Sequence, residues 1–217
     1  ECCGNAASPH AYGKAADEAL EKARKQIASI CGAHSSSVVF TSGATEANNT
    51  GIRGILLPKN RDGILTCNIE HSSVLETVKE LGKSGRHTVI VPSDSSGFVN
   101  PDDIEKSLKS GKIGLVSIMQ ANNEIGTIQP IEEIALICKK YGVIFHVDCC
   151  QTYSKLPISI EDADLITASA HKIGGPKGIG ALIVKPGLRV RPLIYGGTQE
   201  LGLRPGTVNV PGACGMA

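Results

Sequence analysis

Short apolar segments alternate with longer amphipathic segments along almost the whole chain. The apolar runs that we expect to form strands are 38–41, 64–67, 87–91, 113–119, 143–147, 165–167 and 181–184. The segments with helical spacing of their apolar residues are 14–31, 46–57, 74–81, 101–108 and 130–141. Many of the strands are apolar on both faces, as parallel strands covered by helices are. The pattern predicts an α/β fold with a mainly parallel sheet and helices on both faces. The length of 217 residues suits one large or two small domains.

Composition and charge argue against several classes of protein. A net charge of +1, interleaved acids and bases, and few aromatic residues offer no basic or stacking surface, so we expect no direct binding of nucleic acid. No apolar run approaches the roughly 18 residues of a membrane span, so we expect no membrane partner. Histidines, cysteines and acids show no metal-ligand spacing, so we expect no metal.

Cysteine placement indicates a reducing environment. The eight cysteines include the vicinal pairs Cys2–Cys3 and Cys149–Cys150, and none has C-x-x-C spacing. Cys31, Cys67 and Cys138 lie in apolar contexts, as small core residues do. We therefore expect free thiols and an intracellular, reducing location, rather than a disulfide framework.

Polar residues follow several predicted strands. Ligands of parallel sheets bind at the carboxyl ends of the strands. The residues that the sequence places there are Gly43, Ala44, Thr45, His71, Asn122, Asn123, Asp148, Gln151, Ser169, His171 and Lys172.

Lys172 and Asp148 are the pair that most strongly indicates a chemistry. Lys172 follows the predicted strand 165–167, between a histidine and a glycine-proline turn, and we expect it to become buried. A buried lysine is costly unless its pKa falls or it bonds covalently. A lone lysine in a βα loop is more often a surface residue. Asp148 ends another apolar run, and pyridoxal phosphate needs both a lysine for its aldehyde and a carboxylate for its pyridinium nitrogen.

The other motifs each have a plain structural alternative. Residues 42–45 link a strand to a helix, where free N–H groups make an anion site, although a simple N-cap has the same sequence. His71 precedes a helix, so it could cap that helix or stack on a flat cofactor and move protons. Asn122–Asn123 could form an Asx turn or bind a ligand. Neither a P-loop nor a G-x-G-x-x-G pattern is present, which disfavours nucleotide binding.

Taken together, the motifs resemble the cysteine desulfurases, which are pyridoxal-phosphate enzymes of the class V aminotransferase group. The resemblance runs in order from about Asn5 to Gly212. The matching segments are Gly4-Asn5 with Ser8 and Gly13, 41–46, Glu70-His71, 122–126, 146–148, Gln151, 155–157, His171-Lys172, 175–178, Gly196-Gly197 and 204–207.

The resemblance implies a fold, a cofactor and a role for each residue. The fold would be the large domain of fold type I PLP transferases, with residues 1–217 as the PLP-binding domain and a small C-terminal domain outside the chain. Lys172 would bind the cofactor covalently, Asp148 would pair with the ring nitrogen, and Gln151 with the phenolic oxygen. The phosphate would be held by Ala44, Thr45, Ser169 and His171. His71 would stack on the ring as acid and base, and Asn123 would lie near the substrate. Thr207 would reach the phosphate of a second subunit, which implies a homodimer.

The implied reaction removes sulfur from L-cysteine, giving L-alanine and an enzyme persulfide. The sulfur would pass to an acceptor or iron–sulfur scaffold protein, for cluster assembly or tRNA thiolation, in the cytoplasm or a mitochondrion-type organelle. The alternatives are selenocysteine lyase, another PLP-dependent lyase or aminotransferase of this fold, and a non-catalytic scaffold fragment.

Two features depart from the family pattern. Cys149 stands where the family usually has a small alanine beneath the ring, and Ala6-Ala7 replaces a more usual Pro-Ser. The family's nucleophilic cysteine and an arginine for the substrate carboxylate are expected on a C-terminal part that this sequence, which has no initiating Met and resembles an internal piece, does not contain. We assign the nucleophile to none of its cysteines.

Overall fold

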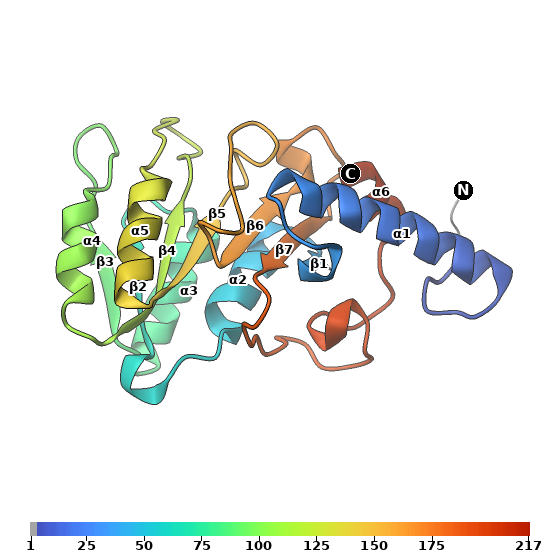
Figure 1. The fold of residues 1–217 in the computed structure, drawn as a ribbon, viewed down its shortest axis with the longest axis horizontal. Helices are drawn as coiled ribbons and strands as arrows, with labels where there is room; N and C mark the ends of the chain where they lie inside the picture. The colour runs from blue at the N-terminus through green and yellow to red at the C-terminus, as the bar shows by residue number, and fades with distance from the viewer. Residues whose placement is uncertain (1–3) are drawn as a thin grey trace.

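A seven-stranded sheet forms the centre of the molecule in the computed structural model, which describes residues 4–217 (Figure 1). The order of the strands is β1-β7-β6-β5-β4-β2-β3. Their bounds are β1 Val38–Thr41, β2 Gly63–Cys67, β3 Thr88–Val91, β4 Ile113–Met119, β5 Ile144–Asp148, β6 Leu165–Ser169 and β7 Gly180–Val184. β7 runs antiparallel to both of its neighbours, β1 and β6, and the other pairings are parallel. The mainly parallel sheet predicted from the sequence is confirmed.

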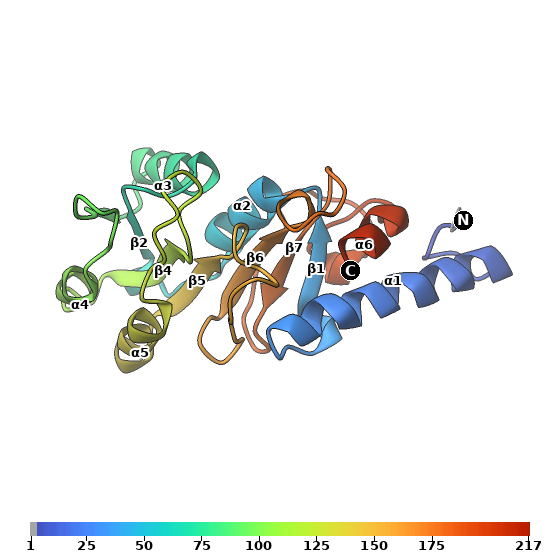
Figure 2. The same cartoon turned by 90° about the horizontal axis from the view of Figure 1, so that it is seen from above.

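Helices cover both faces of this sheet. Their bounds are α1 Ala11–Ile30, α2 Ala44–Gly54, α3 Ser72–Lys83, α4 Pro101–Leu108, α5 Ile131–Tyr141 and α6 Val210–Met216. α2 and α3 lie on one face, and α1, α4 and α5 lie on the other (Figure 2). The apolar side chains form one cluster on each side of the sheet. Because most strands are buried along their whole length, only the ends of the sheet are left for polar chemistry.

The predicted elements are all present, with shifts at their ends. α2 ends at Gly54 rather than at 57, because Ile55 leaves the helix to pair with Val190 in an isolated bridge. A side chain at Gly54 would also meet the carbonyl oxygen of Arg191 at 2.4 Å. The sequence pattern gave no sign of α6, which is short and packs against α1.

The cysteines within the described residues behave as predicted. Cys31, Cys67, Cys138 and Cys149 are buried, and every cysteine of residues 4–217 is a free thiol. Cys2 and Cys3 lie outside the described residues. No helix in residues 4–217 combines the length and the apolar character needed to span a membrane.

Candidate active site

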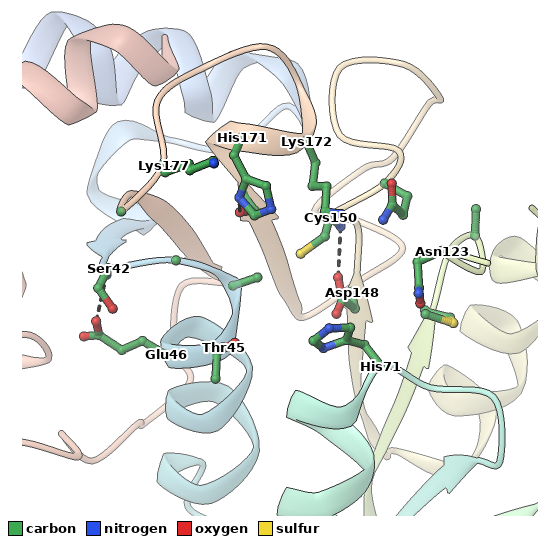
Figure 3. Close-up of a pocket in the computed structure, with 17 residues that line it drawn as sticks. Ser42, Thr45, Glu46, His71, Asn123, Asp148, Cys150, His171, Lys172 and Lys177 are labelled. Carbon is green, nitrogen blue, oxygen red and sulfur yellow. Dashed lines mark hydrogen bonds between the residues drawn. The ribbon is translucent and has the colours of Figure 1, made fainter.

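A cavity of about 510 Å³ opens at the carboxyl edge of the sheet (Figure 3). Its lining comes from the segments that follow β1, β2, β4, β5 and β6, together with the loop before β7. The lining residues are Ser42, Gly43, Ala44, Thr45, Glu46, His71, Met119, Ala121, Asn123, Asp148, Cys150, Gln151, Ser169, His171, Lys172, Lys177 and Gly178. Parallel strands bring their carboxyl ends to one edge, which is why distant motifs of the sequence meet here.

The structure brings nearly all of the predicted site residues together. The residues that line the cavity as expected are Ala44, Thr45, His71, Asn123, Asp148, Gln151, Ser169, His171 and Lys172. Thr207 is exposed and is not among the lining residues. Its expected contact with a second subunit stays a prediction, since one chain is described.

One wall of the cavity is the N-terminus of α2. Gly43 is the N-cap residue, with a φ of 153°. Because glycine has no side chain, the first turn of α2 receives no hydrogen bond from a capping side chain. The first-turn N–H groups of a helix lack intrahelical partners, and they lie at the positive end of the helix dipole. Across from this turn, Ser169 Oγ lies 2.9 Å from His171 Nδ1. The arrangement is suited to binding an anion.

Asp148 forms the floor of the cavity and is 5% exposed. Its Oδ1 accepts the backbone N–H of Cys150 at 2.9 Å, and its Oδ2 accepts Asn48 Nδ2 at 2.8 Å. Two donors to the same carboxylate fix its orientation. A buried, oriented anion at this position can hold a cationic nitrogen.

His71 is the N-cap residue of α3 as well as a lining residue. Its Nδ1 accepts the backbone N–H of Ser73 at 3.1 Å, and Ser73 Oγ lies 2.8 Å from the same nitrogen. The capping role that the sequence left open is confirmed, with Nδ1 used for the cap, and the ring also lines the cavity. Its stacking on a cofactor stays a prediction.

Asn122 and Asn123 have different positions: one forms a turn and the other lines the cavity. Asn122 is buried, and its Oδ1 accepts the N–H groups of Glu124 and Ile125, as in an Asx turn. Asn123 is exposed and lines the cavity. The turn made by Asn122 places Asn123 toward the ligand space.

Lys172 lies at the mouth of the cavity, in the 3₁₀ turn Ala170–Lys172 that follows β6. The expectation that it would be buried is wrong for this chain, since its side chain is exposed. The turn that carries Lys172 is followed by a loop that leads to β7 at Gly180. Figure 3 shows Lys172 extending toward the side of the cavity where Asp148 and Cys150 lie, while Lys177 lies beside His171.

The two vicinal thiols differ in position. Cys149 is fully buried, whereas Cys150 is half-buried and lines the cavity. Burial, followed by the charge of Asp148, raises the pKa of both thiols well above its ordinary value. Because the thiolate is the reactive form, neither cysteine is a good nucleophile in this setting.

Glu70 lies buried behind the cavity wall. Its Oε1 accepts the backbone N–H of Met119 at 2.7 Å and the thiol of Cys67 at 3.1 Å. Burial raises the pKa of Glu70 to about 8, against these two hydrogen bonds, and the charge of Asp148 acts in the same direction as burial. The carboxyl group connects the end of β2 to the end of β4.

Sequence reasoning missed several members of the site. Met119, Ala121, Cys150 and Lys177 line the cavity without having been predicted as ligand-binding residues. Asn48 was missed as well. It could have been found as a polar residue one turn after Thr45, on the face of the helix that is buried. Within residues 4–217, no group of three or more histidine, cysteine or acidic side chains is arranged to hold a metal ion.

The cavity thus combines a primary amine, an imidazole, a buried carboxylate and a helix N-terminus. Such a set can bind an aldehyde covalently, move a proton, hold a cationic nitrogen and hold an anion.

Comparisons with known proteins agree with this chemistry. The cysteine desulfurase IscS of Dictyoglomus turgidum is 46% identical over 217 residues, covering 98% of this chain and 55% of the relative. The mitosomal cysteine desulfurase of Encephalitozoon cuniculi is 45% identical, covering 93% of this chain and 48% of the relative. A solved NifS-like protein superposes with a TM-score of 0.94 at 44% identity, covering 100% of this chain and 60% of that one.

The chain spans about half the length of the curated relatives that it matches. The structural match confirms the fold class that the sequence resemblance implied. The family model described as aminotransferase class-V matches residues 2–217. The chain therefore belongs to the class-V aminotransferase family, and the relatives named above are cysteine desulfurases and a NifS-like protein.

Proposed function

We propose that residues 1–217 form the PLP-binding large domain of a cysteine desulfurase. The observation that carries the proposal is that Lys172, Asp148 and the N-terminus of α2 surround one cavity. The relatives that share the family are named for this activity. The proposed substrate is L-cysteine, and the proposed products are L-alanine and a persulfide.

The residues present match the chemical groups of pyridoxal phosphate. The phosphate suits the uncapped first turn of α2, with Thr45, Ser169 and His171 beside it. The pyridinium nitrogen suits the Asp148 carboxylate, the phenolic oxygen suits Gln151, and the aldehyde suits Lys172. A volume of about 510 Å³ lies in the usual range for cofactor sites.

When bound, the cofactor would supply an electron sink for the substrate's Cα. The chain's own residues would do the rest. Asp148, held by two donors, presents an oriented carboxylate at the floor of the cavity. His71 offers a ring nitrogen at the cavity wall for proton transfer, and Asn123 lies beside it to orient the substrate. Lys172 would hold the cofactor through its side-chain amine.

The proposal leaves the nucleophile outside the residues of this chain. Cys149 and Cys150 carry raised thiol pKa values, and Cys214 does not line the cavity. We propose that the nucleophile belongs to a C-terminal part of the protein, on a loop that reaches this cavity. We further propose a homodimer completed by Thr207, a sulfur-acceptor or iron–sulfur scaffold partner, and a reducing compartment such as the cytoplasm or a mitochondrion-type organelle.

Covalent trapping tests the proposal. The chain is incubated with PLP, reduced with borohydride and mapped by mass spectrometry of its peptides. We expect the pyridoxyl group on Lys172, with Lys177→Ala leaving the label in place and Lys172→Ala removing it. A label on Lys177 or Lys155 in the wild-type chain would refute the assignment of Lys172.

A further inference from the structure

Asn48 connects two walls of the cavity from beneath its surface. It lies on α2, and its side chain is fully buried. Its Nδ2 donates to Asp148 Oδ2 at 2.8 Å and to Ser73 Oγ at 2.9 Å. Its Oδ1 has no hydrogen-bond partner within residues 4–217. The amide is therefore held by its donor end alone, with one N–H for each acceptor.

The direction of each hydrogen bond follows from what the groups can donate. A carboxylate only accepts, so Asp148 determines which end of the Asn48 amide faces it. The second N–H of that amide then donates to the hydroxyl oxygen of Ser73.

The Ser73 hydroxyl proton is left for His71. The backbone N–H of Ser73 already donates to His71 Nδ1 at 3.1 Å, so this nitrogen carries no proton. The hydroxyl, 2.8 Å away, therefore also donates to Nδ1. The proton of the neutral ring then lies on Nε2, the nitrogen that does not face Ser73.

We propose that Asn48 is a positioning residue that orients the carboxylate of Asp148 and directs the Ser73 hydroxyl proton to His71 Nδ1, where it joins the backbone N–H of Ser73 in holding neutral His71 in the tautomer protonated on Nε2. His71 would then present an N–H donor to the cavity rather than a free lone pair that could accept a proton. One amide sets the state of two groups in different walls of the cavity. The role of Asp148 toward the cofactor rests on the proposed function, whereas the tautomer of His71 depends only on this chain.

The tautomer is tested by nitrogen NMR of the full chain labelled with ¹⁵N-histidine, without added PLP. The pH is set about two units above the ordinary imidazole pKa of about 6.5, so that the rings are neutral. We expect His71 Nδ1 to resonate as a bare nitrogen and Nε2 as a protonated one. In Asn48→Ala the Ser73 hydroxyl can turn away, so Nδ1 loses one of its two donors, the tautomer protonated on Nδ1 becomes more populated, and the two shifts should move toward each other. Unchanged His71 shifts in a folded Asn48→Ala variant would overturn the proposal.

Two further variants keep this result interpretable. Ser73→Ala removes the hydroxyl but keeps the backbone N–H on Nδ1. A shift of the Nδ1 signal in the same direction is therefore expected in this variant, even if Asn48→Ala fails to fold. An unchanged Nδ1 signal in Ser73→Ala would contradict the proposed connection from Asn48 through the Ser73 hydroxyl to His71. Asn49→Ala is the matched control, because Asn49 is the next residue of α2 and its amide donates to the carbonyl oxygens of Thr45 and Ser73 instead. It should leave the His71 signals in place.

The orientation of Asp148 has its own measurement. PLP binding to the full chain, followed by absorbance, should be about tenfold weaker in Asn48→Ala, because a hydrogen bond to a charged group is lost. Asn49→Ala should bind as the wild type does, and equal affinity in all three proteins would overturn this half of the proposal. Absence of PLP binding to the complete protein would refute the proposed function, while the NMR result would still decide the tautomer.

Discussion

Gly180, the first residue of β7, lies directly against Gly43, the N-cap residue of α2. A Cβ at position 180 would come within 2.7 Å of the Gly43 carbonyl carbon and 2.8 Å of the Ala168 carbonyl oxygen. Both neighbours are backbone atoms, which cannot turn aside as a flexible side chain can. The absence of a side chain at Gly180 thus lets the antiparallel strand β7 approach the turn that we propose binds the phosphate.

Gly180→Ala should therefore destabilise the protein and weaken binding of PLP together. Overpacking of this kind costs typically about 1–3 kcal/mol. Urea unfolding measures the stability, and PLP titration measures the site. Gly51→Ala is the matched control, since its new Cβ would meet only side chains, at 3.4 Å or more, inside α2. It should be neutral or slightly stabilising, because alanine is favoured over glycine within a helix. Equal stability of the Gly180→Ala protein and the wild type would contradict the steric argument.

A buried ion pair fastens the segment after β7 to α1. Arg24 donates to both carboxylate oxygens of Glu200, at 2.8 and 2.6 Å, and to the carbonyl oxygen of Val38 at 2.6 Å. Glu200 also accepts the backbone N–H of Phe40 at 2.6 Å. Arg24 and Glu200 are 7% and 6% exposed, so removal of one partner leaves an uncompensated buried charge.

Arg24→Ala should consequently lower the free energy of unfolding by about 3–5 kcal/mol. Lys79→Ala provides the comparison, because it breaks a solvent-exposed pair with Glu76, and such pairs contribute little to stability. Equilibrium unfolding in urea measures both. If the two variants lose similar amounts, the buried pair has no special role in stability.

The parts of the fold that could be predicted from the sequence are those determined by residues close together in the chain. The apolar run 113–119 can only be a buried strand, and β4 spans Ile113–Met119. Pro101 with Asp102 and Asp103 starts a helix, and α4 begins at Pro101. Strands that end at one edge of the sheet then place Thr45, His71 and Asp148 in the same cavity.

The remaining features depend on partners that are distant in the sequence. Asn48 is an ordinary helical residue until Asp148, a hundred residues further on, accepts its amide proton. The antiparallel direction of β7 depends on how the loop after Lys172 turns back, and this loop has no periodicity. Exposure of Lys172 depends on which elements pack over its turn, and no local pattern records that.

At saturating PLP, Asp148→Asn should keep the cofactor bound in the complete protein while lowering its turnover. The amide keeps the shape of the carboxylate but loses the charge that would keep the ring nitrogen protonated. Electrostatic groups of this kind are worth roughly 3–4 kcal/mol in catalysis, so we expect a loss of about a hundredfold to a thousandfold in kcat. Alanine formation from L-cysteine is the measurement, with Asn49→Ala as a control. Turnover equal to that of the wild type would exclude the proposed role.

Glu70 should make the stability of the protein fall as the pH rises. Burial raises its pKa from the ordinary 4.5 to about 8, so the folded state holds a proton that the unfolded state releases. Its stabilising contribution is complete below about 4.5 and is lost as the pH rises toward 8, at up to about 1.4 kcal/mol per pH unit. Gln in place of Glu70 is uncharged at every pH, so this variant should lack that part of the slope.

The measurement is the free energy of urea unfolding at several pH values, and the quantity compared is the difference between wild type and Glu70→Gln. Taking the difference cancels the opposite contribution of buried His146, whose pKa is lowered by burial to about 4 and whose stabilisation is lost as the pH falls below about 6.5. Glu76→Gln, on the exposed face of α3, is the control and should not change the slope. Parallel curves for wild type and Glu70→Gln between pH 4.5 and 8 would show that Glu70 is ionised in the folded protein throughout this range. An ionised Glu70 would still accept the Cys67 thiol and the Met119 N–H, so such a result would mean that these two hydrogen bonds outweigh the cost of burying the charge.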